Sequence, residues 1–553
     1  MGIGLVLAAA VATAVAVLTG LPATAPHQSA QQPQAARIST SADRQTADPR
    51  SARGQLASGP TLASVSATPV DAPAASLISG HVRVCGQQSV LGGGPATLPK
   101  GAIRVRAGNN SGVNWRRSYR TYWFAPGVHT LGSGTYSQVQ PGSHSTYIGA
   151  PGAVLNGQHK NDYAFASNAT HVTISYLTIE NFGQKGGNFD QGVVNVDLAA
   201  NWTVDHSTIE DNGGAGVMLA SNNTLTYDCL ADNGQYGFNA YTPRGPSRIV
   251  MDDNEIAGND TYNWEAHQKG CGCTGGGKFW DVNGAVIKNN WVHGNHSVGI
   301  WADTDNRGFD IEDNAFENNY DSGLIYEISY NALIKNNLFS RNALGYGPKN
   351  PGFPTPALYV SESGSDARVH GKFGSTFAIT GNMFVNNWSS VVLWENSNRY
   401  CGSPFVGSTG YCTLVDPSVA NLRTCDQAHL QGSRATQKPD YFDLCRWKVQ
   451  NVAVDDNTFD FSPAAIGSSC TAAKGCGYVG LFSEFGSDPS WSPYKGTIVE
   501  NHITFNQDNH FSDNTYNGPW RFMVWSNGET VSWGRWRGHF RQDKGSTLDR
   551  TAS

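Results

Sequence analysis

Charged residues are scarce in this chain of 553 residues, because Asp, Glu, Lys and Arg together make up only 15% of it. The formal net charge is −6. A mildly acidic chain has no overall basic excess to attract a phosphate backbone, so we expect no nucleic-acid partner.

Several motifs that carry common chemistries are also missing. The chain has no Gly-x-Ser-x-Gly elbow, no Gly-rich loop ending in Gly-Lys-Ser/Thr and no His-Glu-x-x-His. Their absence argues against an α/β-hydrolase, a P-loop nucleotidase and a zinc metalloprotease. No apolar run after the first 25 residues is long enough to cross a bilayer.

Glycine and aromatic residues, by contrast, are abundant. The chain contains 63 Gly, 23 Phe, 21 Tyr and 15 Trp. This composition is typical of secreted all-β proteins. An elongated repeat protein can use such a length as one domain.

The N-terminus predicts export. Residues 1–25 form an apolar stretch that ends in "ATA" and resembles a signal peptide, although no Lys or Arg precedes it, so retention as a membrane anchor is the alternative. Residues 26–75 are rich in Ala, Ser, Gln, Pro and Thr, which predicts a disordered linker. We expect a secreted, extracellular monomer with no stable membrane insertion after cleavage.

Ten cysteines agree with an oxidising compartment. Six of them form pairs that are close in sequence: Cys401 and Cys412, Cys425 and Cys445, Cys470 and Cys476. We expect these pairs to staple insertions within 401–476. Cys85 and Cys229 have no close neighbour, and Cys271 and Cys273 flank one glycine. A zinc site at this last pair is the alternative, but further ligands at suitable spacing are missing.

An internal repeat predicts the fold. The motif Asn-x-apolar-x-x-Asn occurs at 254–259, 290–295, 314–319, 337–342, 382–387 and 501–506. Its tightest spacings are 21, 23 and 24 residues once degenerate copies such as "STIEDN" and "DCLADN" are included. A propeller blade needs about 40 residues, so this period favours a solenoid instead.

Each repeat consists of short strands separated by Asn and Gly turns, as in "GAVIKNNWVHGNHSVGIWAD". Strands this short bury their apolar side chains only when successive coils stack, and turn asparagines can then bond along the stack. We therefore predict an all-β, right-handed parallel β-helix with inserted loops over 76–530, a disulfide-rich C-terminal part, and a tail over 531–553.

Several apolar strands end in an acid. Asp303 lies 11 residues before Asn314, and Glu327 lies 10 before Asn337. These counts place the two acids on neighbouring coils, roughly 5 Å apart. Lys278 lies 12 residues before Asn290, so we expect it close to the same column.

Like charges at that distance need a shared proton or a cation. A shared proton suits a general acid beside a base or nucleophile, and Asp303, Glu327 and Lys278 are our candidate catalytic residues. Asp303, Asp305 and Glu327 could instead hold calcium, the one cofactor we consider. Alternatively, the acids only keep an exposed face soluble, and Asp305 only caps a turn.

Further residues are candidates for substrate binding. Glu362 and Glu395 end similar strands, as does Glu484, and Asp305 lies beside the acids. Trp264, Trp280 and Trp301 lie in the same coils and could stack on sugar rings, or could belong to the core. Asp190 and Asp197 could extend the groove, and a hydrogen-bonding role is expected for His293 and His296.

Three segments resemble a particular family of proteins: "GGGKFW" at 275–280, "GIWADTDN" at 299–306 and "GLIYEISY" at 323–330. The chain resembles secreted bacterial right-handed parallel β-helix repeat proteins, in a subgroup with GG-x-KF, GLW-x-D and EISY elements. Pectinases and alginate lyases share this fold. The resemblance implies the fold and a polysaccharide substrate, but no reaction, because the Asn-Thr-Asp, Asp-Asp and Gly-His-Gly motifs of pectin hydrolases are not found.

Three functions remain open at this point. The first is a glycoside hydrolase with Asp303 and Glu327 as its paired carboxylates. The second is a calcium-dependent polysaccharide lyase with Lys278 as the base. The third is a glycan-binding protein or adhesin without catalysis. An epimerase is a minor further alternative. An unsaturated, ultraviolet-absorbing product would distinguish the lyase from the hydrolase.

Overall fold

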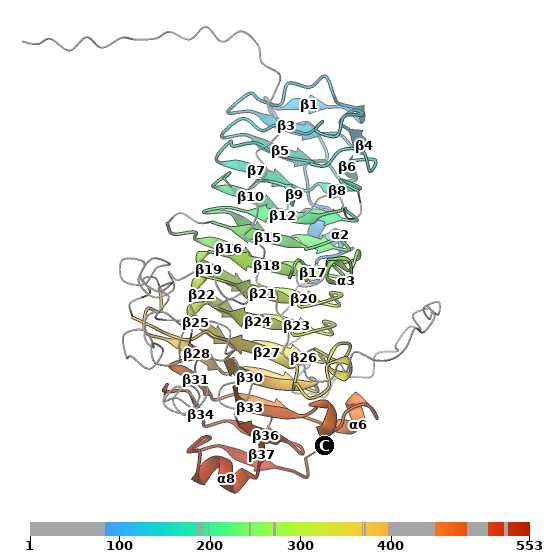
Figure 1. The fold of residues 1–553 in the computed structure, drawn as a ribbon. Coiled ribbons are helices and arrows are strands. Elements are labelled where there is room, and N and C mark those ends of the chain that lie inside the picture. The colour runs from blue at the N-terminus through green and yellow to red at the C-terminus, as the bar shows by residue number, and fades with distance from the viewer. Residues whose placement is uncertain are drawn as a thin grey trace, which may run out of the picture.

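The computed structural model describes residues 83–184, 186, 192–196, 198–242, 245–268, 272–367, 369, 372–395, 448–483, 507–524 and 529–552. Short strands wind into a right-handed parallel β-helix, with successive coils stacked along one axis (Figure 1). The predicted fold is confirmed.

Three sheets run along this axis. In the described residues, the first sheet has 13 strands: β1 (Ile103–Val105), β3 (Thr121–Phe124), β5 (Thr146–Gly149), β7 (Val172–Ser175), β10 (Trp202–Asp205), β13 (Thr224–Thr226), β16 (Ile249–Asp252), β19 (Asn283–Lys288), β22 (Arg307–Glu312), β25 (Tyr330–Lys335), β28 (Phe377–Thr380), β31 (Val452–Asp455) and β34 (His510–Ser512).

The second sheet has 14 strands in the same part of the chain: β2 (Gly108–Asn109), β4 (Gly127–Thr130), β6 (Ala153–Asn156), β8 (Thr178–Glu180), β11 (Thr208–Glu210), β14 (Cys229–Ala231), β17 (Glu255–Ala257), β20 (Trp291–His293), β23 (Ala315–Glu317), β26 (Leu338–Ser340), β29 (Met383–Val385), β32 (Thr458–Asp460), β35 (Thr515–Asn517) and β38 (Thr547–Asp549).

The third sheet has 11 described strands: β9 (Gly192–Val194), β12 (Ala215–Leu219), β15 (Phe238–Tyr241), β18 (Gly277–Trp280), β21 (Ile300–Asp303), β24 (Leu324–Glu327), β27 (Pro356–Ser361), β30 (Ser389–Glu395), β33 (Tyr478–Ser483), β36 (Arg521–Val524) and β37 (Glu529–Val531). The described helices are short: α2 (Gln88–Leu91), α3 (Trp264–His267), η2 (Gly347–Lys349), α6 (Pro463–Ile466), η4 (Ala472–Lys474) and α8 (Trp533–Gly538).

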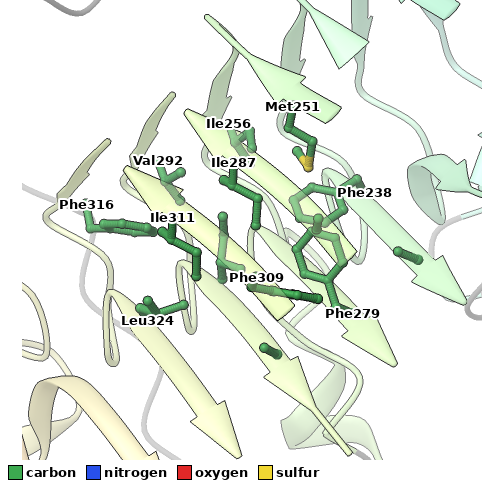
Figure 2. Close-up of a cluster of buried hydrophobic side chains, with 14 of the residues drawn as sticks. Phe238, Met251, Ile256, Phe279, Ile287, Val292, Phe309, Ile311, Phe316 and Leu324 are labelled. Carbon is green, nitrogen blue, oxygen red and sulfur yellow. The ribbon is translucent and has the colours of Figure 1, made fainter. Parts of the chain in front are cut away.

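The core is a continuous row of side chains inside the coils (Figure 2). Phe238, Phe279 and Phe309 come from successive coils, and neighbouring rings in this row have centroids 5.0 Å apart. All three are fully buried. Because side chains alternate between the two faces of a strand, one inward residue in two is enough to fill this core.

Two asparagine ladders follow the turns, as the repeat predicts. The first contains Asn254, Asn290, Asn314, Asn337, Asn382, Asn457 and Asn514, and the second contains Asn212, Asn233, Asn259, Asn295, Asn319, Asn342 and Asn387. Each side-chain amide, except those of the last members Asn387 and Asn514, donates to the side-chain oxygen of the Asn on the next coil. The amide of Asn314, for example, donates to Asn337 Oδ1 at 3.0 Å and to the backbone oxygen of Ile287 at 2.8 Å.

Both ends of the described chain pack onto the coils. At the C-terminal end β36 and β37 pair in antiparallel fashion, and Trp536 of α8 is fully buried. Strand β38 then adds to β35, so part of the predicted C-terminal tail belongs to the second sheet. At the N-terminal end, Cys85 is bonded to Cys229.

The cysteine predictions have mixed outcomes. Cys470 and Cys476 form the expected disulfide. The bond between Cys85 and Cys229 joins residues 144 apart in sequence, which spacing alone did not predict. The other two predicted pairs lie outside the described residues. Among the described helices, none combines the length and apolar character that a bilayer crossing requires.

Candidate active site

The predicted acids meet on the outer face of the third sheet. Ala302 of β21 pairs with Tyr326 of β24, and both point into the core. Asp303 and Glu327 each follow one of these residues, so they lie on the opposite face of neighbouring coils. The sequence therefore placed these two acids correctly.

The position predicted for Lys278 is corrected by the register. Lys278 pairs with Trp301, whereas Trp280 is the residue that pairs with Asp303. The error arose because the turn after β21 is one residue longer than the turn after β18 or β24. Lys278 still faces outward, two residues along the strand, and its Nζ lies 3.0 Å from Asp303 Oδ2.

Three contacts with described residues help to hold the Lys278 ammonium group. Besides Asp303, it donates to the backbone oxygen of Gly272 at 2.9 Å and lies 4.4 Å from the centroid of the Trp301 ring. A carboxylate, a carbonyl oxygen and an aromatic face all interact better with a cation than with a neutral amine. The arrangement therefore favours the charged form of this lysine.

The two acids have different partners. Asp303 accepts from Lys278 on one oxygen and from the Thr304 hydroxyl, at 2.8 Å, on the other. Glu327 Oε2 accepts from the indole N–H of Trp301 at 3.2 Å. Asp303 thus has a cation beside it, and Trp301 connects Lys278 to Glu327.

The site is enclosed, contrary to our expectation of an exposed groove. Exposed fractions are 2% for Lys278, 4% for Trp301, 6% for Asp303 and 2% for Glu327. Burying charges costs free energy unless they are paired. A solubility role for these acids, which needs contact with water, is therefore excluded.

The tryptophans are not exposed sugar platforms. Trp280 and Trp264 are each 5% exposed. Trp280 lies beside Tyr241, with centroids 5.5 Å apart, whereas Trp264 begins α3 and packs against Tyr262 and Cys273, outside the third sheet. Trp301 remains part of the site, through its contacts with Lys278 and Glu327.

The column of acids ends after Glu327. The next residues in register are Ser361 and Trp394, so Glu362 and Glu395 are shifted by one position, a correction to the predicted alignment. Glu362 is fully buried, has a positive φ of 46°, and accepts from the Ser361 hydroxyl.

The remaining candidate acids and histidines are placed as follows. Asp305 is half-buried in a left-handed turn with φ of 58°. His293 Nε2 is hydrogen-bonded to Glu255 Oε1 at 3.0 Å, in agreement with the expected hydrogen-bonding role. The side chain of Glu395, and all of Glu484, Asp190 and Asp197, lie outside the described residues.

The calcium hypothesis gains no support from this geometry. Within the described residues, no three or more His, Cys, Asp or Glu side chains form a group that could hold a metal ion. Asp303, Asp305 and Glu327 are all described, so they do not form such a group. The cation beside Asp303 is the Lys278 ammonium.

The loop behind Lys278 was not predicted from the sequence. The Gly272 backbone oxygen accepts from both Lys278 Nζ and the Tyr236 hydroxyl. Gly272 has φ of 60°, and a Cβ there would lie 3.1 Å from the Trp301 ring. The glycines of "CGCTGGG" were the available signal, because close approach of backbone to side chain requires glycine.

Asp260 anchors the same loop. Its carboxyl accepts from the Trp264 backbone N–H at 3.0 Å and from the Thr274 hydroxyl. Burial raises the pKa of Asp260 to about 6, against the lowering effect of these hydrogen bonds. This acid therefore joins the start of α3 to the segment that leads into β18, the strand that bears Lys278.

Known proteins are similar to this chain in fold. Residues 191–373 match a family model described as right handed beta helix region. No curated protein matches the chain in sequence.

Several solved structures are also similar. The catalytic unit of a GH87 alpha-1,3-glucanase from Streptomyces thermodiastaticus has 14% identity and a TM-score of 0.46, covering 83% of this chain and 71% of that one. The A-module of mannuronan C-5 epimerase AlgE4 from Azotobacter vinelandii has 14% identity and a TM-score of 0.42, covering 65% and 87%. An alginate lyase, AlyF-OU02, has 11% identity and a TM-score of 0.40, covering 83% and 98%. With TM-scores below 0.5 and identities of 11–14%, these likenesses carry no argument about the activity of this chain.

Proposed function

We propose that this protein is a secreted glycoside hydrolase that cleaves a polysaccharide with Asp303 and Glu327. One observation carries the proposal: two carboxyls on neighbouring coils have different surroundings. Asp303 has the Lys278 ammonium at 3.0 Å, whereas Glu327 accepts from a neutral indole N–H. Glycosidases need such a pair, with one acid ionised and the other able to donate a proton.

The roles follow from these surroundings. Asp303 is paired with the Lys278 ammonium, so we assign Asp303 as the nucleophile that attacks the anomeric carbon. Glu327 donates its proton to the leaving glycosidic oxygen and then takes a proton from the water that releases the sugar. Neighbouring coils are about 4.8 Å apart, which is nearer to the separation of about 5–5.5 Å in retaining enzymes than to the wider inverting one.

The contacts of the Lys278 ammonium group argue against a lyase that uses Lys278 as its base. A base must be neutral before it abstracts a proton, and Asp303, the Gly272 carbonyl and the Trp301 ring all favour the ammonium form. In the hydrolase, Lys278 orients Asp303 through their ion pair.

The experiment is a screen of purified protein against a panel of neutral and acidic polysaccharides. We expect new reducing ends without an unsaturated product. Asp303→Asn and Glu327→Gln should each lower turnover by about 10²–10⁴-fold or more. Asp313→Asn, at an exposed turn of the coil that contains Asp303, is the matched control and should retain activity.

Two results would overturn the proposal. Ultraviolet-absorbing, unsaturated ends would indicate elimination instead of hydrolysis. Near-normal cleavage by both folded carboxamide variants, checked by circular dichroism, would place the reaction outside this pair of acids.

A further inference from the structure

We propose that the N-terminal coils of the solenoid bind an acidic polysaccharide at an exposed basic surface. This surface consists of Lys100, Arg104, Arg106, Arg116, Arg117, Arg120, Tyr119, His144 and His171, and we call it the basic end. It belongs to the first coils, at the blue end in Figure 1. The inference does not depend on the proposed hydrolase reaction or on its residues.

The charge distribution of the chain is the first observation. Between residues 83 and 161 there is no Asp or Glu, although the whole chain has 44 of them against 38 Lys and Arg. The same segment contains eight Lys and Arg, and all eight are exposed: Arg83, Lys100, Arg104, Arg106, Arg116, Arg117, Arg120 and Lys160. A weakly acidic protein therefore has one strongly basic end.

These cations are not neutralised within the described structure. Across the described residues, none of the eight forms an ion pair with a carboxylate. Their contacts are with neutral groups: Arg116 Nε donates to Gln140 Oε1, Arg120 donates to the Tyr119 backbone oxygen, and Arg104 lies over the Trp123 ring. Exposed guanidinium groups that lack an acidic partner can bind external anions.

A stack of rings begins next to Arg120, which donates to the backbone oxygen of Tyr119. Tyr119, His144 and His171 occupy turns of successive coils, all with positive φ between 56° and 58°. The centroids of Tyr119 and His144 are 4.7 Å apart, and those of His144 and His171 are 4.5 Å apart. All three residues are exposed, Tyr119 by 72%. The rings therefore form a row on successive coils, parallel to the solenoid axis.

The geometry of this stack favours an acidic sugar over a nucleic acid. Single-stranded nucleic acids bind by stacking their bases on free aromatic faces. Here the faces between neighbouring rings are already occupied, so mainly ring edges are available. Imidazole edges and arginine forks can instead hydrogen-bond to hydroxyl and anionic groups, which alternate along an acidic polysaccharide.

The test is binding of the intact protein to polygalacturonate, with fully methyl-esterified polygalacturonate as the uncharged probe. The variant Arg116→Gln/Arg117→Gln/Arg120→Gln should bind polygalacturonate about 10-fold or more weakly, because each exposed charge contact contributes modestly. Binding by the parent should weaken as salt is added.

Two matched variants distinguish charge from folding effects. Arg116→Lys/Arg117→Lys/Arg120→Lys retains the charge and should bind more tightly than the Gln variant. Arg537→Gln/Arg541→Gln/Arg550→Gln removes three exposed arginines from the opposite end of the chain and should bind as the parent does. Melting temperatures of all variants establish that they are folded.

Three outcomes would overturn the proposal: no binding of polygalacturonate by the parent, equal binding by the folded Gln variant, or equal binding of the methyl-esterified probe. Duplex DNA that binds the parent as tightly as polygalacturonate, and binds the Gln variant equally weakly, would also overturn it. Such a result would show a general attraction for polyanions. Loss of catalysis in Asp303→Asn with unchanged polygalacturonate binding would separate this surface from the candidate active site.

Discussion

At the scale of single residues, the candidate site depends on Lys278. Its ammonium group is the described cation nearest to Asp303, and it also lies over the Trp301 ring that binds Glu327. One lysine therefore determines the surroundings of Asp303 and contacts the residue that binds the second acid. We can therefore predict how a change at Lys278 alters the free energy of unfolding, without knowing the substrate.

Replacing Lys278 by Met should be strongly destabilising, because it leaves the buried carboxylate of Asp303 without its cation. Removing one member of a buried ion pair costs about 3–5 kcal/mol of unfolding free energy. The double variant Lys278→Met/Asp303→Asn should recover part of this loss. Denaturant unfolding of the two single variants and the double variant measures the coupling. A Lys278→Met protein as stable as the parent would contradict the buried ion pair.

At the scale of elements, the asparagine ladders connect the coils. Asn314 accepts from the side-chain amide of Asn290 at 2.9 Å and donates to Asn337 at 3.0 Å. It is completely buried, so water cannot replace these hydrogen bonds.

Asn314→Ala should therefore destabilise the protein by about 2–4 kcal/mol, because it leaves buried amide groups without partners. Asn318→Gly is the matched control: Asn318 is exposed, and its positive φ of 51° is readily adopted by glycine. Thermal unfolding of both variants is the measurement. Equal melting temperatures would mean that the ladder contributes little to stability.

Asp260, in the loop that supports Lys278, should make the stability of the protein depend on pH. Burial raises the pKa of Asp260 to about 6, above its ordinary value of 3.8. The folded state then binds this proton more tightly than the unfolded state does. Its contribution to stability is complete below about pH 4 and is lost as the pH rises through about 6.

Asp260→Asn has no charge at either pH and should remove this dependence. Relative to the variant, the parent should lose roughly 2–3 kcal/mol of unfolding free energy between pH 4 and pH 7. Urea unfolding at the two pH values measures this difference, with Asp313→Asn as a control for the loss of one exposed carboxylate. A parent that gains stability relative to the variant as the pH rises would contradict the raised pKa.

At the scale of the whole molecule, the N-terminal segment is tied to coils far along the chain. Cys85 is bonded to Cys229, and the backbone N–H groups of Val84 and Cys85 donate to Glu255. Val84 packs against Cys229 in a small separate cluster.

The paired variant Cys85→Ser/Cys229→Ser should lower stability by about 2–4 kcal/mol and expose residues 83–100 to proteases. Limited proteolysis and thermal unfolding are the measurements, after mass mapping of the parent. Two free thiols at Cys85 and Cys229 in the protein isolated under oxidising conditions would contradict the disulfide, and would remove one argument for our proposal of export.

Much of the fold was determined by the sequence alone. A period of 21 to 24 residues and asparagines at both ends of each motif specify stacked coils, because short apolar strands can bury their side chains only against the next coil. The same period correctly placed Asp303 beside Glu327. These are local consequences of regular spacing, and they need no knowledge of distant contacts.

Only the tertiary structure decided the rest. Lys278 lies two positions before Trp280 on β18 and therefore pairs with Trp301, and the extra residue in the turn after β21 hid this offset from a count along the sequence. The burial of the site depends on packing over the outer face of the third sheet, and Cys85 meets Cys229 only because the N-terminal segment lies along the coils. Repetition determines neighbours on adjacent coils, whereas turn length and long-range packing determine which side chains make contact.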